Sequence, residues 1–335
     1  MLSGGKGTRL RPLTFTCAKQ LIPIANKPIL GYVLDQVASA NIKSTGIIIS
    51  SKTGQYVKDY VKDGLNWNLK IQYIPQKPLG LAHAVKTAKH FLGYDSFVMC
   101  LGDNITDQGL TAFIKKFKNE KLDALILLKE VENPSDFGIA QLDKEGNIIK
   151  LVEKPKTPMG NLAIIGTCLF SNKIHVAIEK IKPSWRGELE ITDAIQEMIN
   201  MGFSVKAEIL HSWWIDTGKK DNILTANAKI LDIYLQHDVQ GTLTCSTVYD
   251  KAKIAFSTKI INSTIHGPCI IGENVTVENS LIGPYTSIGN NSYITNSHVK
   301  NSIIQENTTI KNINLLENNI TEKNTKITPK NNTTN

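Results

Sequence analysis

The chain has 335 residues, of which 41% are hydrophobic and 20% charged, and its formal net charge is +8. This composition is ordinary for a globular protein and excludes a wholly disordered chain. No apolar run approaches the roughly 18–20 residues of a membrane span, and no run of basic and aromatic residues indicates a nucleic-acid surface. The five cysteines are scattered, with no Cys-x-x-Cys pair, which predicts reduced thiols in the cytoplasm.

The first two thirds of the chain alternate strand and helix patterns. Short apolar runs at 46–50, 96–101 and 123–128 are typical of strands buried on both faces of a parallel sheet. Apolar residues at helical spacing predict helices over 29–38 and 81–91. This alternation predicts a doubly wound, Rossmann-like α/β sheet, whose ligands bind beyond the carboxyl ends of the strands.

From about residue 252, aliphatic residues recur five or six positions apart, separated by small and polar residues. These positions are Ile265, Ile271, Val277, Ile282, Ile288, Ile294, Val299, Ile304 and Ile310. A six-residue period is typical of hexapeptide repeats, so we expect a left-handed parallel β-helix with the aliphatic side chains inside. The predicted organisation is an α/β domain at 1–238, a linker at 239–251, the β-helix at 252–320 and a polar, disordered tail at 321–335.

The first motif that indicates chemistry is LSGGKGTRLRP at 2–12. Three glycines in four positions let backbone amides approach phosphate oxygens closely, and Lys6, Arg9 and Arg11 add positive charge. The spacing is neither that of a Walker A loop nor that of the dinucleotide-binding GxGxxG. Alone it is a weak signal, because many glycine-rich turns have no ligand.

Further segments follow in a fixed order along the chain. They are KQLIPIANKP at 19–28, PLGLA at 78–82, LGDN at 101–104, FG at 137–138, EKP at 153–155, RGELEITD at 186–193 and WIDTG at 214–218. Together with the glycine loop they resemble the sugar nucleotidyltransferase family, in its long form with C-terminal hexapeptide repeats. Each segment alone has a structural explanation, such as a turn at Asp103 or a helix cap at Asp216, but their joint order is specific.

The resemblance implies a Mg²⁺-dependent enzyme that joins a nucleoside triphosphate to a sugar 1-phosphate and releases pyrophosphate. It is strongest for the members that make dTDP-glucose from dTTP and glucose 1-phosphate. The sugar phosphate is already ionised at neutral pH, so this reaction needs charge neutralisation and alignment but no general base. Thymine and uracil differ by one methyl group, so UTP remains the alternative nucleotide.

The resemblance also gives each matching residue a role. The nucleotide-binding residues are Leu2, Gly4, Gly5, Gly7, Thr8, Arg9, Lys19, Gln20, Gln76 and Gly80. The sugar-phosphate-binding residues are Phe137, Gly138, Glu153, Lys154 and Ile164. Asp103 and Asp216 are expected to bind Mg²⁺, since hard carboxylates suit that ion, and Arg9, Lys19 and Lys154 complete the catalytic set. We read Glu188 and Glu190 as acids in the first turn of a helix.

Two other functions are open at this point. An acyltransferase would need a histidine base in the repeats, where His266 and His298 are the only histidines. A non-catalytic scaffold would lack motif residues that this chain has. We expect the β-helix to support a homo-oligomer through its flat faces. Relatives carry more apolar residues before the glycine loop, so we expect the natural chain to start upstream of Met1.

Overall fold

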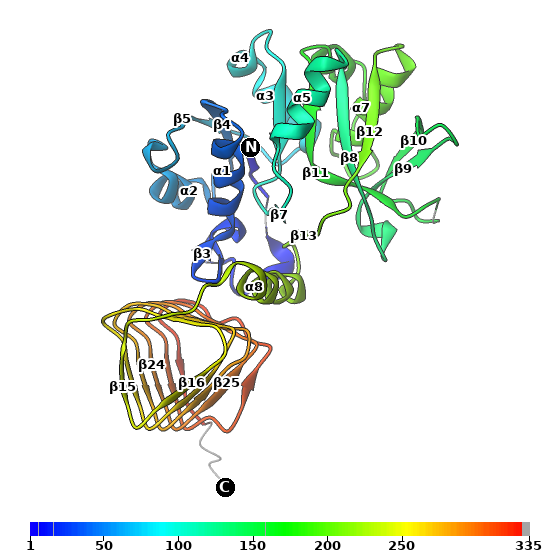
Figure 1. Cartoon of the computed structure of the whole chain (residues 1–335). Coiled ribbons are helices and arrows are strands. Elements are labelled where there is room, and N and C mark those ends of the chain that lie inside the picture. Colours follow the sequence, from blue (N-terminus) through cyan, green and yellow to red (C-terminus); the bar gives the residue numbers. More distant parts are fainter. Residues whose placement is uncertain (6, 16, 158, 330–335) are drawn as a thin grey trace, which may run out of the picture. The chain divides into compact units, whose positions relative to one another are not determined.

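The computed structural model describes residues 1–5, 7–15, 17–157 and 159–329. The chain divides into two compact units (Figure 1). The first comprises Met1–Gly7 and Leu30–Ile215, and the second comprises Thr8–Ile29 and the chain from Asp216 onward. The first unit therefore differs from the α/β domain expected at 1–238. Two segments of that range, 8–29 and 216–238, group with the C-terminal repeats. Lys6, which was expected to add charge to the glycine loop, lies outside the described residues.

Helices surround the strands of the first unit and precede the repeats of the second. They are α1 (Ile29–Ser39), α2 (Gly54–Val61), α3 (Leu81–Thr87), α4 (Lys89–Leu92), α5 (Thr111–Asn119), α6 (Ile174–Ile178), α7 (Ile191–Asn200) and α8 (Lys220–Tyr234). The helix expected over 81–91 is thus split into α3 and α4 at Ala88. Within the described part of the chain, no helix has the length and apolar character needed to cross a bilayer.

The strands of the first unit form a parallel sheet of three strands, a mixed sheet of six and a pair that ends at Asp216, not one wholly parallel sheet. They are β1 (Leu2–Ser3), β4 (Ser44–Ile49), β5 (Lys70–Pro75), β6 (Phe97–Cys100), β7 (Asn104–Thr106), β8 (Ala124–Glu130), β9 (Gly138–Leu142), β10 (Ile148–Glu153), β11 (Leu162–Phe170), β12 (Val205–Ile209) and β13 (Trp214–Asp216). Strands β1, β4 and β5 are parallel, as are β8 and β12. Strand β11 runs antiparallel to both β6 and β8; Figure 1 shows β11 and β8 side by side. An apolar run indicates burial but not direction, so the sequence did not reveal this reversal.

A glycine in β11 explains how this strand fits between its neighbours. The pairing of β11 with β8 shifts register between Ile164 and Cys168. At Gly166 an added Cβ would lie 2.7 Å from Leu101 Cβ. Only glycine therefore allows the backbone of β11 to approach the end of β6 so closely.

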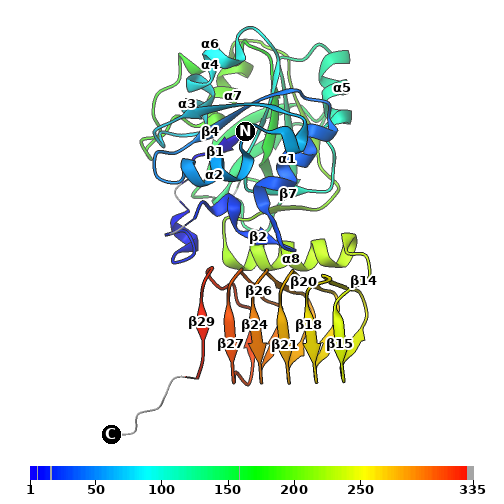
Figure 2. The ribbon, with the colours of Figure 1, turned by 90° about the vertical axis from the view of Figure 1, so that its left-hand side faces the viewer.

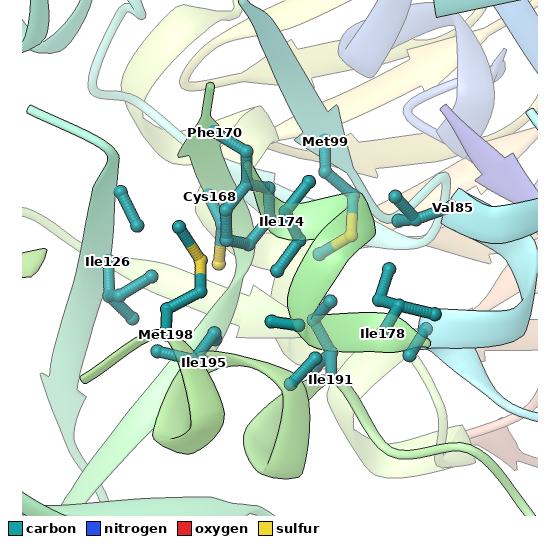
Figure 3. Close-up of a cluster of buried hydrophobic side chains, with 14 of the residues drawn as sticks. Val85, Met99, Ile126, Cys168, Phe170, Ile174, Ile178, Ile191, Ile195 and Met198 are labelled. Carbon is teal, nitrogen blue, oxygen red and sulfur yellow. The ribbon is translucent and has the colours of Figure 1, made fainter. Parts of the chain in front are cut away.

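The core of the first unit lies between the sheet and helices α3, α6 and α7. Figure 3 shows Met198, Ile195 and Ile191 of α7 pointing toward Ile126 of β8 and Phe170 of β11. These side chains are all less than 5% exposed. Burying each such side chain contributes about 1.5–3 kcal/mol, so this packing fixes the strand ends that carry the motifs.

A separate apolar cavity of about 300 Å³ lies beside the first strand. It is lined by residues of β4 and β6, including Gly46 and Met99. The amino group of Met1 donates a hydrogen bond to the Gly46 carbonyl over 2.8 Å.

The second unit is dominated by a parallel β-solenoid, which confirms the expected repeats. Its described strands make three sheets of five, six and five strands. Figure 2 shows the strands of the six-stranded sheet side by side, from β15 to β29. The strands are β14 (Asp238–Val239), β15 (Thr242–Thr244), β16 (Thr247–Tyr249), β17 (Ala252–Ile254), β18 (Lys259–Ile261), β19 (Thr264–His266), β20 (Cys269–Ile271), β21 (Thr276–Glu278), β22 (Leu281–Ile282), β23 (Thr286–Ile288), β24 (Tyr293–Thr295), β25 (His298–Lys300), β26 (Ile303–Ile304), β27 (Thr309–Lys311), β28 (Leu316–Glu317) and β29 (Lys326–Ile327). The repeating aliphatic residues all belong to its buried core.

The solenoid extends beyond the range expected for it. Residues expected to form a linker make a first coil, since β14, β15 and β16 pair with β17, β18 and β19. At the other end β29 pairs with β27, so the expected tail begins inside the solenoid. Residues 330–335 of that tail lie outside the described part of the chain. An end coil has one face without a neighbouring coil and carries polar residues there. These residues make the aliphatic pattern of the repeat hard to recognise in the sequence.

Asparagines form the corners of the solenoid. Asn279 and Asn296 have φ of 46° and 47°, a left-handed conformation that asparagine tolerates better than most residues. The side chains stack from coil to coil, as where Asn296 donates to Asn312 over 3.0 Å. This explains why asparagine recurs between the aliphatic positions.

Two segments outside the repeats pack on the solenoid within the second unit. Helix α8 lies along it (Figure 2), with the Asn227 amide donating to the Tyr285 carbonyl and accepting from Ser287. The hairpin of β2 (Pro23–Ile24) and β3 (Lys27–Pro28) is fixed by Asn26, which donates to the Ile288 carbonyl over 2.8 Å. These contacts explain why the two segments group with the solenoid.

Candidate functional site

In the first unit, three predicted site residues follow the carboxyl ends of strands. Gly4 follows β1, Gln76 follows β5 and Asp103 lies just beyond β6. The Leu2 carbonyl accepts a hydrogen bond from the Gly102 amide over 2.9 Å, which joins the ends of β1 and β6. Ligands of open α/β sheets bind at this edge. The structure thus brings these three residues to the edge where a nucleotide is expected.

The glycine loop lies beside Gln76. A Cβ added to Gly4 would lie 3.7 Å from Gln76 Oε1, and Gly7 has a φ of 62°. Gly5 is exposed, whereas the Leu2 side chain belongs to the hydrophobic core. Leu2 therefore offers only its backbone to a ligand.

The turn at Gly80 is held against the segment that precedes α7. Gly80 has a φ of 106°, and an added Cβ would lie 2.3 Å from the Leu189 carbonyl oxygen. Two backbone hydrogen bonds fasten this approach: Ala82 N donates to Leu189 O over 3.0 Å, and Leu189 N donates to Leu79 O over 2.9 Å. Only glycine fits here, both for its φ and for the space.

The predicted sugar residues converge around Gly138. A Cβ added there would lie 2.5 Å from Thr192 Cγ2, 3.0 Å from Glu153 Oε2 and 3.8 Å from Ile164 Cδ1. Thr192 also donates weakly to Glu153 Oε2 over 3.4 Å. Residues from β9, β10, β11 and α7 therefore meet at one point, which the missing side chain of Gly138 leaves open.

Phe137 and Lys154 are joined at the rim of this group. Lys154 N donates to the Phe137 carbonyl over 3.0 Å, and Lys154 has a φ of 44°. The Phe137 ring packs edge-on against Trp214, with centroids 5.6 Å apart. A non-glycine residue at positive φ is uncommon and costs free energy, and such residues cluster at functional sites.

A single arginine neutralises the acidic groups beside the sugar residues. Arg186 lies 3.4 Å from Glu153, 3.2 Å from Glu188 and 3.2 Å from Glu190. Burial raises the pKa of Glu153, and the nearby Glu190 carboxylate raises it further. Burial likewise raises the pKa of Glu190, which is 3% exposed. The guanidinium therefore compensates carboxylates that would otherwise be costly to bury.

Asp103 is oriented by a short chain of hydrogen bonds. The Asp103 carboxylate is 6% exposed and accepts from Asn104 Nδ2 over 3.3 Å. Asn104 Oδ1 in turn accepts from the Trp214 indole over 2.8 Å. Strands β7 and β13, which carry Asn104 and Trp214, also pair with each other. Trp214 therefore supports both the acidic residue and the Phe137 ring.

The remaining predicted residues belong to the second unit. Thr8 and Arg9 lie exposed in the 3₁₀ helix η1 (Thr8–Leu10), and Lys19 lies half-buried in η2 (Lys19–Leu21). Gln20 is 1% exposed, and its buried Oε1 has no hydrogen-bond partner among the described residues. An unpartnered buried acceptor is costly and calls for an explanation at a functional site.

Asp216 is held by the turn that follows it. Its Oδ1 accepts from Gly218 N over 3.1 Å, and its backbone carbonyl accepts from Asn222 over 2.7 Å. A Cβ added to Gly218 would lie 3.2 Å from the same Oδ1. The carboxylate is therefore oriented by a backbone amide where glycine leaves it room.

The carboxylates of the candidate site fit a magnesium ion whose remaining ligands are substrate oxygens. Among the residues that the structure describes, no three His, Cys, Asp or Glu side chains are grouped to hold a metal. Mg²⁺ typically binds one or two carboxylates together with substrate phosphates and water. The buried carboxylate of Asp103 suits that mode.

Some functional residues were missed by the sequence reading. Arg186 lies in a recognised segment but received no individual role, and Glu190 was expected only to be an acid of a first helical turn. Glu190 is the residue before α7 and Glu188 lies before it, so the expectation that both fall in the first helical turn is wrong. Trp214 also received no role. Only the fold shows that Arg186 and Trp214 contact the predicted sugar-binding residues Glu153 and Phe137.

Comparison with known proteins agrees with this arrangement. Residues 1–233 match the nucleotidyl transferase family. The chain is 40% identical to a glucose-1-phosphate thymidylyltransferase of Streptomyces antibioticus, over 98% of this chain and 92% of the relative. It is 41% identical to the low-salt glycan biosynthesis nucleotidyltransferase Agl11 of Haloferax volcanii, over 91% of this chain and 86% of the relative.

The solved structures show the same fold in the N-terminal part. A Bacillus anthracis protein assigned as a glucose-1-phosphate thymidylyltransferase has a TM-score of 0.65 and 32% identity. The match covers 69% of this chain and 94% of that protein.

Proposed function

Because the chain belongs to the nucleotidyl transferase family, we propose that it transfers a thymidylyl group from dTTP to glucose 1-phosphate. The products are dTDP-glucose and pyrophosphate. The observation that supports this function most is that the segment between Ser184 and Thr192 contacts two groups of predicted site residues. It holds the Gly80 turn through Leu189 and the sugar residues through Arg186 and Thr192. One segment therefore sets the spacing between a base site and a sugar site.

The proposed reaction is an in-line displacement at the α-phosphorus of the nucleotide. A phosphate oxygen of the sugar forms the new P–O bond, and the bond to the bridging oxygen of the departing pyrophosphate breaks. The attacking oxygen is already ionised, so the residues act by position and charge. Lys154 binds the sugar phosphate, Glu153 accepts from sugar hydroxyls, and Arg9 and Lys19 neutralise the leaving pyrophosphate.

The same proposal assigns Mg²⁺ to Asp103 and Asp216. The ion supplies neutralisation of charge on the phosphate oxygens. The chain's own part is to orient both carboxylates, Asp103 through Asn104 and Asp216 through the Gly218 amide.

We further propose a cytoplasmic homo-oligomer that contacts neither nucleic acid nor membrane. The flat sheets of the solenoid offer regular surfaces for a second copy. Light scattering of the purified protein across a dilution series measures the oligomeric state, and a monomer at every concentration contradicts it.

Pyrophosphate release tests the function. The protein is incubated with Mg²⁺, glucose 1-phosphate and, in parallel, dTTP, UTP, ATP, CTP and GTP. We expect release to be fastest with dTTP. Preference for UTP keeps the mechanism and changes the product, and no release with any nucleotide contradicts the proposal.

A further inference from the structure

The amide group of Gln76 has a defined orientation. Its nitrogen Nε2 lies 3.2 Å from the Gly80 carbonyl oxygen and 3.1 Å from His83 Nδ1. A carbonyl oxygen accepts hydrogen bonds and never donates them. The side of the amide that faces Gly80 must therefore be the NH₂ group, which then also faces the imidazole.

This orientation determines the tautomer of His83. An NH₂ group donates, so Nδ1 must accept and the ring proton must lie on Nε2. The Thr87 hydroxyl lies 3.4 Å from Nδ1, but it donates its one proton to the His83 backbone carbonyl over 2.8 Å. A proton on Nδ1 would point at the closer Gln76 NH₂ group, 3.1 Å away, and would place two donors face to face. Burial lowers the pKa of His83, and the nearby Lys86 lowers it further. The neutral ring that the hydrogen bond requires is thus also the favoured form.

With its nitrogen held on one side, Gln76 presents its oxygen on the other. Oε1 lies toward the glycine loop, 3.7 Å from the position of a Cβ on Gly4. No hydrogen bond to this oxygen is found within the described residues. An acceptor therefore faces the loop where the nucleotide is proposed to bind.

We propose that His83 is a positioning residue that fixes the Gln76 amide so that the site selects pyrimidines with an imino N–H. This inference rests on the proposed function. Thymine and uracil carry a proton on N3 and donate to Oε1, whereas N3 of cytosine is an acceptor and is repelled. A reversed amide would prefer cytosine. Discrimination arises because a mismatched base places an acceptor opposite Oε1 and leaves both groups unpaired in the complex.

The test compares kcat/KM for dTTP and dCTP in the wild type and in two variants. His83→Ala removes the acceptor, and we expect the dTTP-to-dCTP ratio to fall about tenfold, the effect of one neutral hydrogen bond. His83→Asn places an amide oxygen near the Nδ1 position, so we expect it to restore most of the ratio. His90→Ala, at an exposed histidine of α4, is the matched control and should leave the ratio unchanged.

The outcomes separate this inference from the proposed function. A residue that only supports the fold would lower kcat/KM for both nucleotides equally, so an unchanged ratio in His83→Ala overturns the inference alone. A ratio lowered equally in the Asn variant also contradicts the acceptor role. A wild type that is inactive with every nucleotide overturns the proposed function and this inference with it. The expected loss appears in KM for dTTP and not in KM for glucose 1-phosphate.

Discussion

Replacing Gly80 by alanine should destabilise the first unit far more than a comparable glycine replacement elsewhere. Gly80 has φ of 106° and ψ of 167°, a region open almost only to glycine, which costs another residue about 1–3 kcal/mol. The added Cβ would lie 2.3 Å from Leu189 O and 2.7 Å from Leu189 N. The turn at Gly80 and the segment at Leu189 must therefore move apart. This movement breaks the two backbone hydrogen bonds between them, which are worth about 1 kcal/mol each.

The expected total is a loss of about 3–5 kcal/mol from an unfolding free energy of about 5–15 kcal/mol. The control is Gly93→Ala, where φ is 59° but no atom lies within 4 Å of the added Cβ. There φ of 59° with ψ of −130° is again a conformation that favours glycine, and the backbone strain alone predicts a loss of about 1–3 kcal/mol. Urea unfolding of both variants, followed by circular dichroism, measures the difference. Equal losses in the two variants would refute the argument from close approach.

Three further predictions concern the site and the core. Asp103→Asn should lower kcat at least about 100-fold, because it removes a group that stabilises charge in the transition state. The thermal midpoint of unfolding should not change. An unchanged rate contradicts the metal assignment. Gly138→Ala should raise KM for glucose 1-phosphate about tenfold or more and leave KM for dTTP nearly unchanged, because its Cβ would crowd Thr192 and Glu153; equal rises would count against the sugar site. Burial lowers the pKa of His175 below its ordinary value of 6.5. As the pH falls, His175 therefore binds a proton in the unfolded chain before it does so in the folded chain. Stability should be complete above pH 6.5 and decrease as the pH falls toward the folded-state value. His175→Leu should flatten that decrease in urea titrations at several pH values.

The solenoid was predictable because its signal is local and periodic. Ile265, Ile282 and Val299 occupy equivalent positions in successive coils, where each must fill the same interior. Its first coil was not predictable in the same way. Strand Thr242–Thr244 is exposed throughout, and its Leu243, which pairs with Ile260 of the next coil, is 40% exposed and not part of the buried interior.

The order of strands in the first unit depends on long-range pairing. The apolar runs gave β4, β6 and β8 correctly, since burial selects the same residues whichever way a neighbour runs. The antiparallel β11 depends on Gly166 meeting Leu101, a contact between residues 65 positions apart in the sequence. No local pattern contains that information.

In the candidate site, too, local features could be predicted from the sequence and long-range contacts could not. Gly80, Gly138 and Asp103 were predicted from their motifs, because each motif keeps a short backbone geometry intact. The hydrogen bonds from Gln76 to His83, from Trp214 to Asn104 and from Arg186 to Glu153 link separate motifs. Their roles follow only from the fold.

The central claim is that a sugar phosphate oxygen attacks the α-phosphorus of dTTP. It is tested most directly with glucose 1-phosphate that carries ¹⁸O in the non-bridging oxygens of its phosphate. Mass spectrometry then locates the label in the products. The account predicts that all of it is retained in dTDP-glucose and that pyrophosphate is unlabelled. Label in the pyrophosphate, or no dTDP-glucose at all, would contradict the account.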